Sequence, residues 1–392
     1  MAWAARVYSC FALALLGWGI AVQTYFPTPT KQPAFTSCAP AGSTICWAED
    51  KLLGPLRRYD VYWYIGIAER GYGQRKGDTA FHPLYPALMA GVGRLLGGHY
   101  LLGGWVVAQI CCIGMLTVLP RLIALDDDSV IARRAPLLML ASPLGFAFLI
   151  PYTESLLVLC LASAIYAART RRWILAGLAG AGAALTKQPG AVVALPLIMI
   201  LWEQHGAAIR AGQWRDLLRP AAGMALIPLA LGGWIVYRAS LGDVHFDWTE
   251  PRSAISALLV TPSYAEVWTE TFELPWVPFT HAVHALATAP YFYLAFNVTI
   301  MLILLGVALA SLWRAPRSIA PLTAALVLLN LSIDYPTWPY MGIIRRFTII
   351  YPIFVQAARW TRRPLAWATL ILLSLLMWLY VSAAYVHNAF VP

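Results

Sequence analysis

The sequence predicts an all-α polytopic membrane protein, and three observations lead to this class. Of the 392 residues, 60% are hydrophobic and only 12% are charged, about half the charged share of a soluble globular protein. Apolar stretches of about 20 residues, the length that crosses a bilayer as a helix, recur along the whole chain. The 17 tryptophans and 19 tyrosines suit aromatic belts at the two membrane interfaces.

About eleven of these stretches are predicted to cross the bilayer. The first is interpreted as an uncleaved anchor, because no clear small-residue cleavage site follows it. A shorter apolar stretch, 81–97, is expected to form a re-entrant or interfacial helix. Several spans are short, so broken or tilted helices are expected. The predicted spans are, in chain order, 9–26, 100–123, 131–150, 152–168, 173–187, 190–203, 220–240, 289–313, 318–334, 344–358 and 364–386.

The basic residues predict the orientation of the chain. Positive charge marks cytoplasmic loops, so the N-terminus is predicted to be cytoplasmic and the C-terminus extracytoplasmic. Residues 1–392 then form a single membrane domain with two large extracytoplasmic loops, 27–80 and 241–288. Because the arginines follow this topology, the net charge of +10 does not indicate nucleic-acid binding. They recur in the connections 124–130 with its flanks, 169–172, 204–219, 314–317 and 359–363.

Asp60 is the strongest candidate for chemistry, because it is a carboxylate among aromatic residues at a predicted membrane surface. Residues 57–70 are expected to form an interfacial helix, with Tyr64 on the same face as Asp60 at i, i+4 spacing. A carboxylate in this place suits a general base. An equally weighted alternative is an ion pair with Arg57 or Arg58 that only fixes the loop.

The cysteines predict one disulfide and no metal site. Cys38 and Cys46 lie close together in the first predicted outer loop, where an oxidising compartment favours a small disulfide ring. The other cysteines lie in apolar spans. No Cys/His spacing indicates zinc, and no Gly-rich motif indicates a nucleotide. We therefore expect neither a metal nor a cofactor.

Four segments of the chain resemble the PIG-V-type mannosyltransferases, relatives of the second mannosyltransferase of GPI-anchor synthesis. The resemblance covers roughly residues 55–355. Three residues depart from the family pattern: Tyr59 replaces a Trp, His82 a Phe and Lys187 an Arg. The matching residues are Tyr59-Asp60, Trp63-Tyr64, Ile67-Ala68 and Gly71-Tyr72, then Ala80 to Pro86, Ser142 to Leu156, Leu185 to Gly190, and Arg346-Phe347 with Tyr351-Pro352.

The resemblance implies a glycosyltransferase of the GT-C class with the GT-C-type fold. Such an enzyme would move a sugar, here mannose, from a polyprenyl-phosphate carrier to a hydroxyl of an extracytoplasmic acceptor, with inversion at the anomeric carbon. Asp60 would be the base. The acceptor could be a glycolipid, a lipoglycan or a protein, and a prokaryotic plasma membrane with the active site facing outside is expected.

The remaining candidate residues are assigned to donor, sugar and acceptor. Arginine binds phosphate bidentately, and Arg345 and Arg346 are expected at the start of a helix, where the dipole also favours an anion. The alternative is that they snorkel toward lipid headgroups. Lys187 is a further phosphate ligand or, alternatively, the ion-pair partner of Glu154. Substrate contacts are expected from His82, Tyr85, Tyr152, Glu154 and Tyr64, and acceptor contacts from Asp243 and His245.

Other classes remain open for this sequence. His82 could equally be a satisfied interfacial histidine. A transporter or flippase for lipid-linked glycans would be expected to show internal repeats and midplane charges, and we find no convincing repeat. An envelope polymerase or ligase acting on a lipid-linked glycan is a further alternative, and so is a non-catalytic membrane scaffold.

Overall fold

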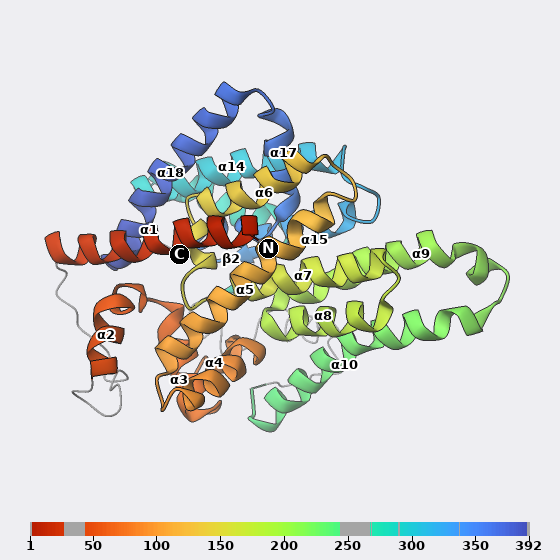
Figure 1. Ribbon diagram of the computed structural model, residues 1–392, viewed down its shortest axis with the longest axis horizontal. Helices are drawn as coiled ribbons and strands as arrows, with labels where there is room; N and C mark the ends of the chain where they lie inside the picture. Colours follow the sequence, from red (N-terminus) through yellow and green to blue (C-terminus); the bar gives the residue numbers. More distant parts are fainter. Residues whose placement is uncertain are drawn as a thin grey trace. The chain divides into compact units, whose positions relative to one another are not determined.

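The computed structural model describes residues 2–26, 44–243, 267, 269–288, 291–336 and 338–389. Nearly all regular structure in these ranges is helical (Figure 1). The first helices are α1 (Ala2–Tyr25), α2 (Thr44–Leu52), η1 (Gly54–Leu56), α3 (Asp60–Arg70), η2 (Asp78–Ala80), α4 (Leu84–Leu95), α5 (Tyr100–Ile123), α6 (Ser129–Ala141) and η3 (Gly145–Phe148). The others are α7 (Glu154–Arg169), α8 (Trp173–Thr186), η4 (Gln188–Val193), α9 (Ala194–Arg210), η5 (Trp214–Leu217), α10 (Leu218–Ser240), α13 (Trp276–Thr288), α14 (Phe292–Leu312), α15 (Ala320–Leu331), α16 (Ile343–Thr348), α17 (Tyr351–Trp360) and α18 (Pro364–Val386).

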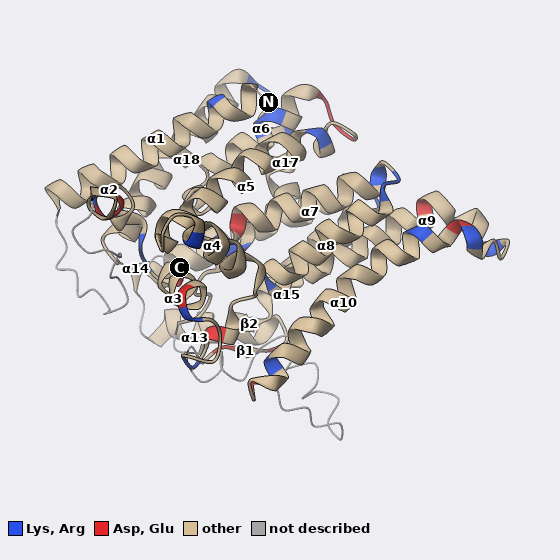
Figure 2. Cartoon of the chain, turned by 60° about the horizontal axis from the view of Figure 1, so that its bottom comes forward, with Lys and Arg blue, Asp and Glu red and all other residues tan. Residues whose placement is uncertain are grey.

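Six of the described helical segments are long and apolar enough to cross a membrane. The apolar helices α8 and α15 are shorter. Charged residues gather at the helix ends and in the connections, while the long helices are uncharged over most of their length (Figure 2). This is the make-up of a multi-pass membrane protein, although the predicted count of about eleven spans is not confirmed. The six segments are Ala2–Tyr25, Tyr100–Ile123, Gln188–Arg210, Trp214–Ser240, Phe292–Leu312 and Pro364–Val386.

Two predicted spans are interrupted helices. In 131–150, α6 ends at Ala141 and the chain continues through η3. The break coincides with Pro143, since a proline disfavours the helical conformation of the residue before it. In 344–358, α16 and α17 are separate helices with Ile349 and Ile350 between them. The expectation of broken helices is confirmed in both places.

The chain divides into two compact units. The first contains residues 1–74, 83–159 and 358–391. Within it α1 packs on α18, and α4 packs on both α3 and α5. Helices α4 and α5 approach each other closely. A Cβ added to Gly103 on α5 would lie 2.6 Å from the backbone nitrogen of Gly93 on α4.

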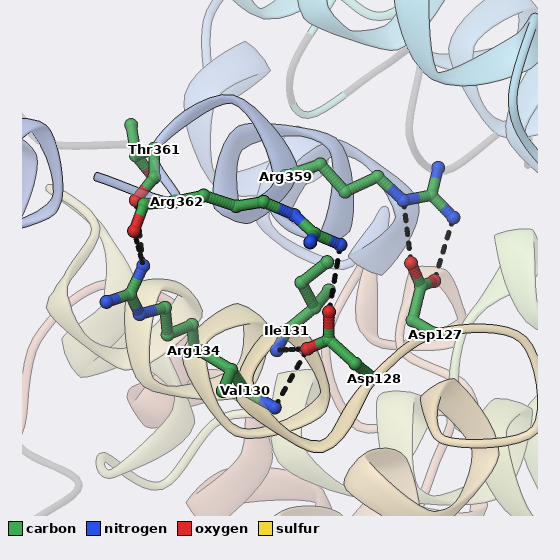
Figure 3. A network of polar contacts seen from close by, with 8 residues as sticks. All are labelled: Asp127, Asp128, Val130, Ile131, Arg134, Arg359, Thr361 and Arg362. Atoms are coloured by element: carbon green, nitrogen blue, oxygen red, sulfur yellow. Dashed lines mark hydrogen bonds and ion pairs between the residues drawn. The ribbon is translucent and has the colours of Figure 1, made fainter. Parts of the chain in front are cut away.

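An ion-pair network joins the α5–α6 connection to the end of α17 within this unit (Figure 3). Arg359 binds Asp127 with two hydrogen bonds, of 2.8 and 2.7 Å. Arg362 Nη2 lies 2.8 Å from Asp128 Oδ2. Asp128 also caps α6, because its Oδ1 accepts hydrogen bonds from the backbone of the helix's first turn.

The second unit contains residues 75–82 and 160–357. Its α8 and α10 run in parallel and touch through small residues, since a Cβ on Gly177 would overlap the carbonyl oxygen of Gly223 at 1.9 Å. Close backbone approach of this kind is common where helices associate in a membrane. The only strands among the described residues, β1 (Thr271–Phe272) and β2 (Ile333–Asp334), pair antiparallel.

Candidate active site

Asp60 is the first residue of α3 and is half-buried. A carboxylate in the first turn is favoured by the helix dipole. The preceding residue, Tyr59, has a φ of +50°, which is uncommon for a residue with a bulky side chain. Gly71 ends the helix with a φ of +81°. A helix within the predicted range 57–70 is therefore confirmed, although it begins only at Asp60, and so is its glycine terminus; its place at the membrane interface stays a prediction.

Arg57 and Arg58, the cations that could pair with Asp60, make other polar contacts within the first unit. Arg57 Nη1 lies 3.0 Å from Asp50 Oδ1. The buried Arg58 donates to the carbonyl oxygens of Gly54, Arg57 and Val386 at 2.9–3.0 Å. Each arginine therefore stabilises the loop before α3 through contacts of its own.

A group of tyrosines surrounds the helix face that Asp60 shares with Tyr64. The Tyr64 ring lies 5.0 Å from Tyr85 and 6.4 Å from Tyr152, both edge-on. Tyr85 is held in turn by a hydrogen bond of 2.9 Å from its hydroxyl to the carbonyl of Gly104. The structure therefore brings these three predicted substrate residues together, from α3, α4 and the turn before α7.

Glu154 lies at the start of α7 and is 1% exposed. It interacts electrostatically with Tyr85, which places it beside the same group of tyrosines. Its neighbour Ser155 donates a hydrogen bond of 3.2 Å to the carbonyl of Ala108 and so joins α7 to α5. Glu154 thus belongs with Tyr64, Tyr85 and Tyr152 in the first unit.

His82 belongs to the second unit. Its Nδ1 lies 2.7 Å from the carbonyl oxygen of Ala184, and its ring lies 5.9 Å from Trp234. Burial is the main cause that lowers the pKa of His82 to about 4; the charges of Arg238 and Lys187 contribute to the lowering, and the hydrogen bond to Ala184 opposes it. The ring is therefore neutral at pH 7. Because a carbonyl only accepts, Nδ1 carries the proton and Nε2 is left as an acceptor.

Arg346 is a buried arginine at which the described residues leave hydrogen-bond donors unused. It is 9% exposed and donates from Nη2 to the carbonyl of Met341 at 2.8 Å. Its guanidinium carbon lies 5.6 Å from the centre of the Tyr335 ring. Its Nε and Nη1 are buried and have no hydrogen-bond partner in the described ranges. Such a cation would gain most from binding an anion.

A helix begins beside Arg345 and Arg346, as the sequence predicted, because α16 starts at Ile343. The helix is only six residues long and ends at Thr348, so both arginines also lie in its last turn. The predicted span 344–358 is broken after α16, and a helix this short has a smaller dipole than a full span would have.

Glu270 and Tyr335 form a buried pair that the sequence did not reveal. The strand register sets Thr271 opposite Asp334, so the residues beyond them face each other. Glu270 accepts a hydrogen bond from the Tyr335 hydroxyl. Burial raises the pKa of Glu270, whereas the hydrogen bond and the charges of Arg346 and Lys187 oppose the rise. Lys187, half-buried at the end of α8, therefore acts on both His82 and Glu270.

Other candidates have different surroundings or fall outside the description. Asp243, expected near the acceptor, pairs with the buried Arg238 at 3.1 Å. His245 and Cys38 lie outside the described residues. Cys46 is disulfide-bonded, which agrees with the predicted ring, while its pairing with Cys38 stays a prediction. No group of three or more metal-binding side chains occurs in the described part of the chain.

Comparisons with known proteins give weak structural likeness and no match in sequence. No model of a protein family matches this chain, and no curated protein sequence matches it. The chain is similar to a solved structure of the archaeal oligosaccharyltransferase AglB from Archaeoglobus fulgidus, in complex with an inhibitory peptide and a dolichol-phosphate. The identity is 12% and the TM-score is 0.44. The match covers 99% of this chain and 56% of the other, so this chain spans little more than half the length of AglB.

Proposed function

We propose that this chain is an inverting, GT-C-type glycosyltransferase that moves a sugar from a polyprenyl-phosphate carrier to an acceptor hydroxyl. The observation that carries the proposal is Arg346, a buried cation whose Nε and Nη1 have no acceptor among the described residues. The oxygens of a phosphate monoester or diester carry the negative charge that such donors bind. Mannose as the sugar, and the outer face of a prokaryotic plasma membrane as the place, follow the resemblance of the motifs.

Asp60 would act as the general base. Its carboxylate takes the proton of the acceptor hydroxyl as the hydroxyl oxygen forms a bond to the anomeric carbon. The bond between that carbon and the phosphate oxygen breaks on the opposite face, and its electron pair leaves with the polyprenyl phosphate. The half-buried position of Asp60 at the start of α3 keeps the carboxylate accessible to an acceptor.

Arg346 would stabilise the charge that develops on the departing phosphate. This leaving group needs a cation more than it needs an acid, because polyprenyl phosphate is a stable anion. A fixed guanidinium in a buried site requires little reorganisation when that charge appears. Lys187 would add a second positive charge. Substrate contacts beside Asp60 would come from Tyr64, Tyr85, Tyr152 and Glu154. The predicted roles of the other candidates are kept: donor phosphate binding by Arg345, substrate binding by His82, and acceptor contacts by Asp243 and His245.

The test is transfer from labelled polyprenyl-phosphate-mannose into extracted envelope lipids by the purified protein. Asp60→Asn is expected to lower the rate by about 10²–10⁴-fold, the usual contribution of a general base. Glu69→Gln is the matched control, because Glu69 lies on the same helix and is exposed. It should retain the rate of the natural protein.

Each other outcome has a separate meaning. Equal transfer by the Asp60→Asn variant would remove Asp60 as the base. Donor binding without transfer would point to a different sugar or acceptor. Absence of binding would contradict the proposal and favour the transporter.

A further inference from the structure

Three buried polar side chains in the second unit lack hydrogen bonds that their atoms could make with the described residues. Asn297 on α14 is 1% exposed, and both its Oδ1 and its Nδ2 are unsatisfied. Asn330 on α15 is fully buried, and its Oδ1 is unsatisfied, while its Nδ2 lies 3.4 Å from the carbonyl oxygen of Arg346. Asp334 on β2 is 1% exposed, with one oxygen unsatisfied and the other 2.7 Å from His281 Nδ1.

The fold brings these side chains toward Arg346. Helix α14 packs on both α15 and α16, and α15 packs on α16 and β2. Asn297 lies about 22 Å before the end of α14, and Asn330 lies about 15 Å after the start of α15, at 1.5 Å per residue. A short connection, 313–319, joins the two helices, which pack on each other. Measured from this connection, Asn297 therefore lies at about the same height as the end of α15 and the start of β2, which carries Asp334.

Unsatisfied polar groups of this kind are rare in protein interiors. Buried amides and carboxylates are nearly always hydrogen-bonded, and the penalty for leaving them unsatisfied is larger in apolar surroundings. Several unsatisfied polar side chains in one region therefore indicate that a polar ligand binds there. The two amides offer donors and acceptors, and the carboxylate offers an acceptor. Sugar hydroxyls, each of which both donates and accepts, match this combination.

We propose that Asn297, Asn330 and Asp334 bind the hydroxyl groups of the transferred sugar while Arg346 binds its phosphate. This inference rests on the proposed function and specifies the donor's headgroup. The carboxylate of Asp334 would repel an acidic sugar. The site therefore takes a neutral hexose and excludes a uronic acid.

The experiment compares the binding of two lipids of equal chain length, polyprenyl phosphate and polyprenyl-phosphate-mannose, to the purified protein in nanodiscs. Asn297→Leu is expected to weaken binding of the mannose conjugate about three- to tenfold, the value of one or two hydrogen bonds. Binding of polyprenyl phosphate should change less than twofold. A third lipid, a uronic acid conjugate of the same chain length, tests Asp334. Asp334→Asn, which keeps the shape of the side chain, should narrow the difference in affinity between this acidic conjugate and the mannose conjugate.

The control on the same helix is Ser311→Ala. Ser311 is buried near the far end of α14, and its hydroxyl donates to the carbonyl of Ala308, so this variant should bind both lipids as the natural protein does. A thermal unfolding curve accompanies each variant. Asn297→Leu should not lower the melting temperature, because it replaces an unsatisfied amide with an apolar side chain of similar size.

Two results would overturn the inference alone. In the first, Asn297→Leu and Asp334→Asn bind both lipids normally, as expected if water satisfies these groups. In the second, Asn297→Leu weakens the binding of both lipids equally, so that the effect does not depend on the sugar. If the natural protein binds neither lipid, the proposed function fails as well, and this outcome is distinguishable because it does not depend on the variants.

Discussion

Arg58 donates a hydrogen bond of 3.0 Å from Nε to the carbonyl oxygen of Val386. The bond joins the loop before α3 to the last residue of α18. Two further bonds strengthen the connection, from the Tyr385 hydroxyl to the carbonyl of Leu56 at 2.9 Å and from the Tyr59 hydroxyl to that of Ala389 at 2.7 Å. The end of the chain thus holds the residues that directly precede Asp60.

The Tyr385 hydroxyl also lies 3.3 Å from the carbonyl oxygen of Arg58 and hydrogen-bonds to Tyr152. We predict that Tyr385→Phe lowers the free energy of unfolding by about 1–3 kcal/mol, the usual effect of losing one or two buried hydrogen bonds. Because the bond fixes the loop before Asp60, kcat should fall while KM for the donor stays unchanged. Thermal unfolding and steady-state transfer measure the two effects. Tyr380→Phe is the control, since Tyr380 lies on the same helix and is 59% exposed. An equal loss in both variants would contradict a positioning role for Tyr385.

The sequence predicted the first-unit part of the candidate site better than the second. Tyr64 shares a helical face with Asp60, and a short apolar helix carries Tyr85, so their meeting follows from local pattern. Glu270 and Tyr335 meet only through two strands of two residues each. Strands so short leave no alternation of polar and apolar residues to detect, and their pairing is a tertiary event.

Broken helices limited the prediction elsewhere. A run of apolar residues looks the same whether it forms one helix or two short ones. The position of the break between α16 and α17 therefore could not be predicted, nor could the shortness of the helix that carries Arg346. The unsatisfied amide of Asn297 also carries no signal in sequence, because a single polar residue in an apolar span has many structural uses.

We predict that Arg346→Gln weakens binding of polyprenyl phosphate about 10–100-fold, the range for a hydrogen bond to a charged group. Arg346→Lys should recover only part of the affinity, because an ammonium cannot bind two phosphate oxygens as a guanidinium fork does. Lipid binding in nanodiscs checks both variants. Arg363→Gln, at an exposed arginine, is the control. Full affinity in Arg346→Gln would exclude Arg346 as a phosphate ligand.

The lowered pKa of His82 predicts a pH-dependent stability. The folded protein holds this ring neutral down to about pH 4, whereas an unfolded chain protonates histidine near pH 6.5. The unfolded state thus binds more protons between these values. The stabilisation is complete above pH 6.5 and decreases as the pH falls toward 4, by up to about 3 kcal/mol.

Replacing His82 with Phe removes this titration. As the pH falls from 7 to 4.5, the melting temperature of the natural protein should therefore fall more than that of His82→Phe. A second variant, His205→Phe, is the control for replacing a histidine with phenylalanine, at a ring that lies 6.3 Å from the ring of Trp173. A constant difference between the natural protein and His82→Phe would show that His82 is not held neutral.

The ion pairs of Figure 3 predict unequal effects for two neighbouring aspartates. Asp127 and Arg359 are 10% and 14% exposed in their side chains and form two parallel hydrogen bonds, whereas Asp128 and Arg362 are 45% and 64% exposed. Removing one member of a largely buried pair leaves an uncompensated charge. Asp127→Asn should therefore lower the free energy of unfolding by about 2 kcal/mol, with little relief at high salt.

Asp128 combines an exposed ion pair with a helix cap, and these two roles can be separated. Asp128→Ser keeps a side-chain oxygen that can cap α6 and removes only the ion pair, which is screened by solvent. Asp128→Ala removes both. We expect the serine variant to melt close to the natural protein and the alanine variant to melt lower, independently of salt. Equal melting temperatures of the two variants would mean that the hydrogen bonds from the α6 backbone to the Asp128 side chain do not stabilise the helix.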